Sequence, residues 1–135
     1  MKKILIIHNR YRILGGEDVA VDNEIALLSK HYKVETIFFQ NEIENYFSQF
    51  FYFISNKNKT SVSELEKKIE EFQPDIAYVH NTWFKASLAI FNVLSKNNIK
   101  TLVKLHNFRY DCTRFFLTKN HLKTDHTCYK CGMIK

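Results

Sequence analysis

Glycine and proline are scarce in this sequence, which holds three glycines and one proline in 135 residues. Because these residues punctuate turns, their scarcity predicts long regular elements and argues against a turn-rich β-sandwich or barrel. No internal repeat and no low-complexity linker is visible. A chain of this length fits one domain and buries roughly two-thirds of its surface on folding, so we expect a single domain over residues 1–135.

Long apolar runs are also missing. No run approaches the ~20 residues that a membrane-spanning helix needs, and Ile4–Ile7 after the basic start is too short for a signal peptide. We therefore expect a cytoplasmic protein, whose three cysteines are thiols or metal ligands rather than disulfides. Lys and Arg number 20 against 14 Asp and Glu, a net charge of +6, which allows anionic partners without favouring any one of them.

Apolar runs alternate with helical patterns along the chain. We expect buried strands at residues 3–7, 34–39, 75–79 and 101–105, and helices between them at 17–32, 63–72 and 86–96. The second of these helices is expected to start with a capping box, Ser63 and Glu66, and to stop at Pro74. Since parallel neighbours need crossover helices, this order predicts an α/β fold with a Rossmann-like parallel sheet flanked by helices.

Three of the expected strands end in the same dipeptide: His8-Asn9, His80-Asn81 and His106-Asn107. Ligands of such sheets bind beyond the carboxyl ends of the strands. These six side chains are therefore predicted to lie along one edge of the sheet. The alternative is that His and Asn simply suit the exit from a strand, where Asn tolerates turn geometry.

Gly15 and Gly16 stand just before the first expected helix. Glycine lets a backbone approach a ligand, and a helix start offers free N–H groups to a phosphate. Neither the dinucleotide fingerprint nor a Walker loop is present. Glu17 and Asp18 compete for the same N–H groups, so a plain turn and a phosphate site both remain open.

The cysteines form a second candidate site. Cys128 and Cys131 are spaced to hold one tetrahedral metal ion, Cys112 can be a third ligand, and His126 or His121 the fourth. Free thiols are the alternative. A redox pair is less expected, because it would open a helix after a strand in the first half of the fold.

Residues 46–54 are rich in aromatic side chains. As a helix this segment places Phe47, Phe50, Phe51 and Ile54 on one face. It can then rest peripherally on the inner face of an anionic membrane, with the basic residues that follow beside lipid phosphates. The favoured alternative is a core helix that covers the sheet.

Three segments, in this order, resemble the family 4 glycosyltransferases of bacteria. They are residues 8–28 with Gly15-Gly16, residues 74–82, and residues 105–112, which are followed by Cys128-x-x-Cys131. The resemblance implies the GT-B plan, in which two Rossmann-like domains enclose the active site between them. The N-terminal domain receives the acceptor and the C-terminal domain holds most of the nucleotide-sugar. Residues 1–135 are then a truncated acceptor-side domain, with a cysteine-containing segment at about 108–135.

The resemblance also implies roles for individual residues. Gly15 and Gly16 match a loop that faces the donor diphosphate, and Arg109 is a phosphate partner beside it. His106 matches a histidine near the transferred sugar, where it can hydrogen-bond a hydroxyl or the developing charge. The remaining polar residues at the strand ends belong to the acceptor side: His8, His80, Asn81 and Asn107. Similar cysteines recur in the family, which favours a structural zinc.

One family feature is missing. The second domain of these enzymes grips the donor with two glutamates that have seven residues between them, and no two glutamates of this sequence have that spacing. We therefore expect the chain to need a donor domain or a partner chain, and to be inactive alone. The implied acceptor is a lipid-linked or lipopolysaccharide glycan of the cell surface. The rival function is a non-catalytic Rossmann-like module for a phosphorylated ligand or a partner chain. A nucleic-acid binder is not expected, because the basic residues are scattered.

Overall fold

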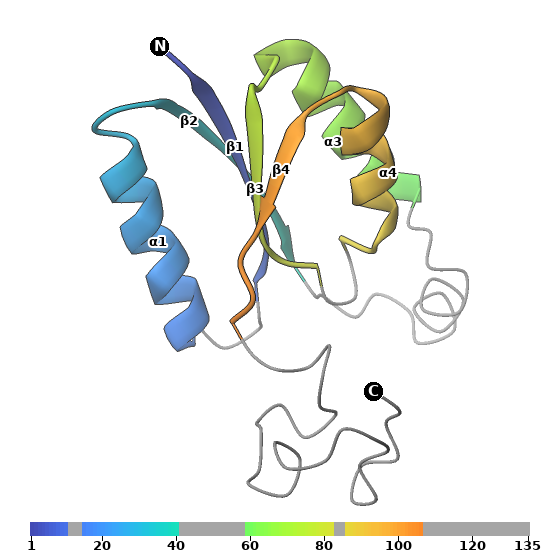
Figure 1. Ribbon diagram of the computed structural model, residues 1–135. Helices are drawn as coiled ribbons and strands as arrows, with labels where there is room; N and C mark the ends of the chain where they lie inside the picture. The colour runs from blue at the N-terminus through green and yellow to red at the C-terminus, as the bar shows by residue number, and fades with distance from the viewer. Residues whose placement is uncertain (11–14, 41–58, 83–85, 107–135) are drawn as a thin grey trace, which may run out of the picture. The chain divides into compact units, whose positions relative to one another are not determined.

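The computed structural model describes residues 1–10, 15–40, 59–82 and 86–106 (Figure 1). The chain divides into two compact units, Met1–Lys104 and Leu105–Lys135. All helices and strands described below belong to the first unit. The aromatic stretch 46–54 lies outside the described residues, so both of its interpretations stay predictions.

Four strands form one sheet in which every neighbouring pair is parallel. They are β1 (Lys3–Arg10), β2 (Lys33–Gln40), β3 (Ile76–Asn81) and β4 (Lys100–Val103). Their order across the sheet is β2-β1-β3-β4. The expected α/β class, with a Rossmann-like parallel sheet, is confirmed. The central strand β1 is apolar and buried on both faces, as a strand inside a parallel sheet must be.

Helices cover both faces of this sheet (Figure 1). Helix α1 (Gly16–Leu28) lies on one face, and α3 (Lys59–Phe72) and α4 (Ala89–Lys96) lie on the other. The core on the α3–α4 side consists of Leu5, Ile7, Ile37, Phe39, Leu65, Ile69, Phe72, Ala77, Val79, Ala86, Ile90, Val93 and Leu94. The core on the α1 side consists of Ile4, Ile6 and Val21, with Ile25, Leu28, Val34, Phe38 and Tyr78 packed against them.

Two expected helix starts were wrong. Helix α3 begins at Lys59, so Ser63 lies inside the helix and does not cap it. Its buried face extends one turn upstream of Leu65 to Ser61, because packing on the sheet extends the helix beyond the local capping signal. Helix α4 begins at Ala89 rather than at residue 86, because Ser87 adopts the left-handed backbone conformation with φ 55°.

The strand ends also differ from expectation. Strand β1 continues to Arg10 and β3 to Asn81, so the His-Asn pairs at 8–9 and 80–81 lie within strands rather than after them. The ladder between the two strands shifts register between Ile7 and His8. Strand β4 stops at Val103, two residues earlier than expected.

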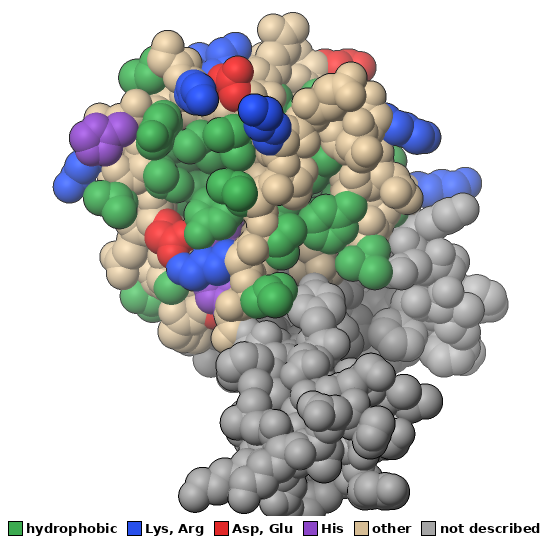
Figure 2. Space-filling model, in the orientation of Figure 1, with side chains coloured by type: hydrophobic (Ala, Val, Ile, Leu, Met, Phe, Trp, Pro, Cys, Tyr) green, Lys and Arg blue, Asp and Glu red, His purple; other side chains and the backbone are tan. Residues whose placement is uncertain are grey.

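Strand β4 is an edge strand, and its apolar side chains are only partly covered. Leu102 is 58% exposed and Val103 is 49% exposed. Figure 2 shows hydrophobic side chains gathered on the face of the first unit that is turned toward the viewer.

No helix within the described residues combines the length and the apolar character needed to cross a membrane.

Candidate functional site

The last residues of the neighbouring strands β1 and β3 bring two histidines together. The ring centroids of His8 and His80 are 6.1 Å apart, edge to face. His8 and Asn9 are fully buried, and His80 is 5% exposed. The predicted proximity of His8 and His80 is therefore present, but both rings lie inside the unit rather than along an open edge of the sheet.

Asp18 joins His8 to the glycine turn. One carboxylate oxygen of this fully buried residue, Oδ1, lies 3.1 Å from His8 Nε2. The other, Oδ2, accepts a hydrogen bond of 3.0 Å from the backbone N–H of Gly15. Asp18 is the third residue of α1, where a carboxylate suits the positive end of the helix. The Gly15 N–H is therefore already occupied by a carboxylate of the chain itself.

Burial lowers the pKa of His8 below its ordinary value of 6.5, and the hydrogen bond and the charge of Asp18 only partly oppose this effect. A carboxylate only accepts hydrogen bonds, so the neutral ring carries its proton on Nε2. His8 Nδ1 is buried and has no hydrogen-bond partner among the residues that the structure describes. The pair thus couples a neutral imidazole to a buried carboxylate.

The lowered pKa of His8 predicts that acid destabilises the fold. Below pH 6.5 the unfolded chain binds a proton at His8 that the folded chain does not, so the free energy of unfolding falls as the pH falls. The loss is at most about 1.4 kcal/mol per pH unit. Urea unfolding between pH 8 and pH 5 measures this slope, and the range leaves Glu24, whose pKa is lowered from 4.5, ionised. A flat profile together with an NMR titration of the His8 ring near 6.5 would contradict the prediction.

Glu24 of α1 forms a second polar cluster under the same helix. Its Oε1 pairs with Lys104 Nζ, just after β4, and Tyr78 of β3 also hydrogen-bonds to it. Its Oε2 lies 3.6 Å from His80 Nε2. Burial acts to raise the pKa of Glu24, but the hydrogen bonds from Lys104 and Tyr78 outweigh it and the pKa is lowered. Burial and the neighbouring carboxylate raise the pKa of Tyr78 to about 12.

A third contact ties the end of β1 to α1. Arg10 Nη2 donates a 2.7 Å hydrogen bond to Asp22 Oδ1. The Arg10 guanidinium lies 3.9 Å from the centre of the Phe38 ring, on β2. Such stacking holds an arginine in one orientation while keeping its charge. Arg10 is thus a fixed cation at the carboxyl end of the sheet.

The roles of Arg10, Glu24 and Lys104 were not predicted from the sequence. The sequence does show which face of α1 packs on the sheet, because Asp18, Val21 and Ile25 recur at helical spacing. No local pattern reveals that Glu24 meets Lys104, since 80 residues separate them.

Neither glycine is required by the backbone. Gly15 has φ −114°, an ordinary extended value, and Gly16 opens helix α1. A Cβ on Gly16 would have nothing within 4 Å, and a Cβ on Gly15 would meet only Asp18 Oδ2 at 3.9 Å. If glycine is needed at position 16, the need comes from something that approaches the turn.

We expect Gly16→Ala to stabilise the protein by about 0.4–1 kcal/mol, because alanine lowers the entropy of the unfolded chain and fits the folded one. Thermal unfolding of the two proteins measures the difference. Gly15→Ala is the companion variant, since its Cβ lies in ordinary contact with Asp18. A lower melting temperature for Gly16→Ala would show that the turn does not have this geometry.

Other predicted site residues fall outside this arrangement. His106 belongs to the second unit, and its place relative to His8 and His80 stays a prediction. The side chain of Asn81 and a further set lie outside the described residues: Asn107, Arg109, Cys112, His121, His126, Cys128 and Cys131. Within the described ranges, no group of three or more His, Cys, Asp or Glu residues could hold a metal ion. The zinc site therefore stays a prediction.

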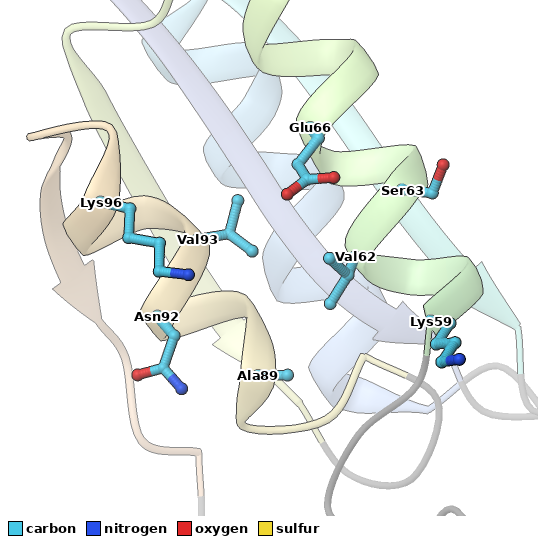
Figure 3. A pocket seen from close by; sticks show the side chains of 8 residues that line it. All are labelled: Lys59, Val62, Ser63, Glu66, Ala89, Asn92, Val93 and Lys96. Carbon is cyan, nitrogen blue, oxygen red and sulfur yellow. The ribbon is translucent and has the colours of Figure 1, made fainter.

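A groove of about 370 Å³ lies between α3 and α4, on the other face of the sheet from the histidines (Figure 3). Val62 and Val93 supply apolar surface within it, and charged side chains border it. The complete lining is Lys59, Val62, Ser63, Glu66, Ala89, Asn92, Val93 and Lys96. The groove shares no residue with the polar clusters under α1.

No protein-family model, no curated protein and no solved structure matches the chain.

Proposed function

We propose that this chain is the acceptor-side part of a GT-B glycosyltransferase, which moves a sugar from a nucleotide-sugar to a cell-surface glycan or a lipid-linked acceptor. The observation that carries the proposal is the meeting of His8 and His80 at the carboxyl ends of two adjacent parallel strands. Ligands of Rossmann-like sheets bind beyond these ends. The resemblance of residues 8–28, 74–82 and 105–112 to family 4 enzymes supplies the reaction.

In such an enzyme the buried and the exposed polar residues have different roles. His8 and His80 are buried, so they position neighbouring residues of the site and do not touch substrate. Contact with the donor falls to the glycine turn and Arg109, and contact with the transferred sugar falls to His106. The nucleotide-sugar is held by a donor domain or a partner chain. The proposed place of action is the cytoplasmic face of the membrane, where a lipid-linked acceptor lies.

The sharpest test uses Gly16, because its replacement leaves room in the fold. In a protein that joins this chain to a donor-binding domain, we expect Gly16→Ala to lower sugar transfer while the melting temperature stays equal or rises. The physical reason is that a methyl group on the turn would keep the donor diphosphate at a distance. Unchanged transfer by Gly16→Ala would remove the turn from the donor site, and absence of transfer to glycan acceptors by the unsubstituted protein would overturn the proposal.

The burial of both histidines favours a second candidate, a Rossmann-like module that binds a phosphorylated ligand or a partner chain without catalysis. The two functions differ in what the isolated chain does with inorganic pyrophosphate. A binding module holds it unaided, with micromolar affinity measurable by calorimetry. Half of a transferase binds it weakly, because the opposing domain supplies most of the contacts.

A further inference from the structure

Asp18 occupies a position that links two functional candidates, the glycine turn and the histidine at the end of β1. We propose that Asp18 is a positioning residue that holds the Gly15–Gly16 turn against His8. The conformation of the turn then changes when the His8 ring gains or loses a proton. This coupling does not depend on any ligand. Its use in binding a donor diphosphate rests on the proposed function.

The geometry uses both oxygens of one carboxylate. Oδ1 lies 3.1 Å from His8 Nε2 and Oδ2 lies 3.0 Å from the Gly15 nitrogen. The Asp18 side chain is fully buried, as is the His8 ring. Asparagine at this position can keep both contacts, because its oxygen still accepts from Gly15 and its NH2 group donates to a His8 Nε2 that carries no proton. Alanine has neither group, so Asp18→Ala removes both contacts at once.

The surroundings of His8 decide what a second proton on the ring does. Asp18 and Asp22 of α1 attract a charged ring, and Arg10 of the same strand repels it. The centre of the His8 ring lies 6.1 Å from that of His80 on β3 and 6.3 Å from that of Phe38 on β2. A proton added to the ring strengthens its hold on Asp18 Oδ1. The same carboxylate accepts the hydrogen bond from the Gly15 N–H, so protonation of His8 alters the hydrogen bond that holds the turn.

For an enzyme, the consequence is that Asp18, rather than a ligand, determines the direction of the Gly15 N–H. The Gly15 N–H points at Asp18 and is held there, whereas a Cβ on Gly16 would stand in open space. A carboxylate beside the turn opposes an approaching anion. Protonation of His8 weakens this opposition, so anion binding at the turn is expected to be tighter below the midpoint of the His8 titration than above it.

The test is an NMR titration of the ¹⁵N-labelled chain from pH 8 downward, through the midpoint of the His8 ring. We expect the Gly15 amide resonance to move with the same midpoint as the His8 ring, which needs no substitution. In Asp18→Ala we expect that coupling to vanish and the Gly15 amide to exchange with solvent about tenfold faster, the factor that one lost hydrogen bond supplies. Asp22→Ala is the matched control, because its carboxylate pairs with Arg10 and is 53% exposed. It should leave Gly15 exchange unchanged.

Each outcome decides a separate point. A Gly15 resonance that does not shift with the His8 titration overturns the proposal, and this measurement stands even if Asp18→Ala fails to fold. Equal Gly15 exchange in the unsubstituted chain and a folded Asp18→Ala overturns it as well. Millimolar inorganic pyrophosphate is then added at one pH below and one pH above the midpoint of the His8 titration. If Gly15 and Gly16 shift with it, the donor-facing role of the turn is supported; if they do not, that role fails while the coupling stands on the titration.

Discussion

Leu5→Ala is expected to destabilise the protein by about 3–5 kcal/mol, the upper part of the range for deleting a buried leucine side chain. Leu5 is fully buried on the central strand β1, and it belongs to the core between the sheet and the helices α3 and α4. The surrounding strands are fixed by hydrogen bonds on both sides of β1, so the cavity cannot readily collapse. In thermal unfolding the loss corresponds to a drop of more than roughly 10 °C.

The matched control is Leu102→Ala on the edge strand β4. Leu102 is 58% exposed, so removal of the same atoms should cost no more than about 0.5 kcal/mol. Denaturant unfolding of both variants, with the slope against denaturant compared, measures the difference. Equal losses for Leu5→Ala and Leu102→Ala would mean that β1 is not the centre of the sheet.

His106→Ala is expected to lower sugar transfer by about 10²–10³-fold in a protein that joins this chain to a donor-binding domain. The reason is the proposed contact of His106 with the transferred sugar, where loss of one hydrogen-bond donor to developing charge costs about this much. Rates should be measured at saturating donor, so that the turnover number and not only the Michaelis constant is compared. The melting temperature should stay close to that of the unsubstituted protein.

His31→Ala is the control for this substitution. His31 is exposed in the turn between α1 and β2, well separated in sequence from the segment around residue 106. Its replacement should leave transfer unchanged. If His106→Ala transfers sugar as fast as His31→Ala does, His106 has no part in the reaction, although the rest of the proposed function would survive.

The four strands and the parallel sheet were predictable because their signal is local. Ile4–Ile7 is an uninterrupted apolar run, and such runs separated by helical patterns leave few alternatives to a parallel α/β sheet. The end of α3 was predictable from Pro74, and in the structure Gln73, with φ 51°, follows the last helical residue. The starts of α3 and α4 were missed, because packing on the sheet and the left-handed Ser87 outweighed the local patterns.

The candidate site was predictable only in part. Of the six side chains predicted to share one edge of the sheet, the rings of His8 and His80 lie 6.1 Å apart, since parallel strands end at the same edge. Their burial was not predictable, because it depends on where α1 lies over the sheet. The competition of Asp18 for the N–H groups of the turn was expected from charge and position, and the bond to Gly15 bears this out.

Composition and periodicity, read along the chain, are enough to establish that this protein is an α/β molecule with polar residues at its strand ends. Both properties arise from neighbours a few residues apart, which sequence displays directly. The partners of those polar residues depend instead on the strand order β2-β1-β3-β4 and on the face that α1 covers. These choices bring Glu24 to Lys104 and His8 to Asp18, and they are made by packing between distant segments, which no local pattern encodes.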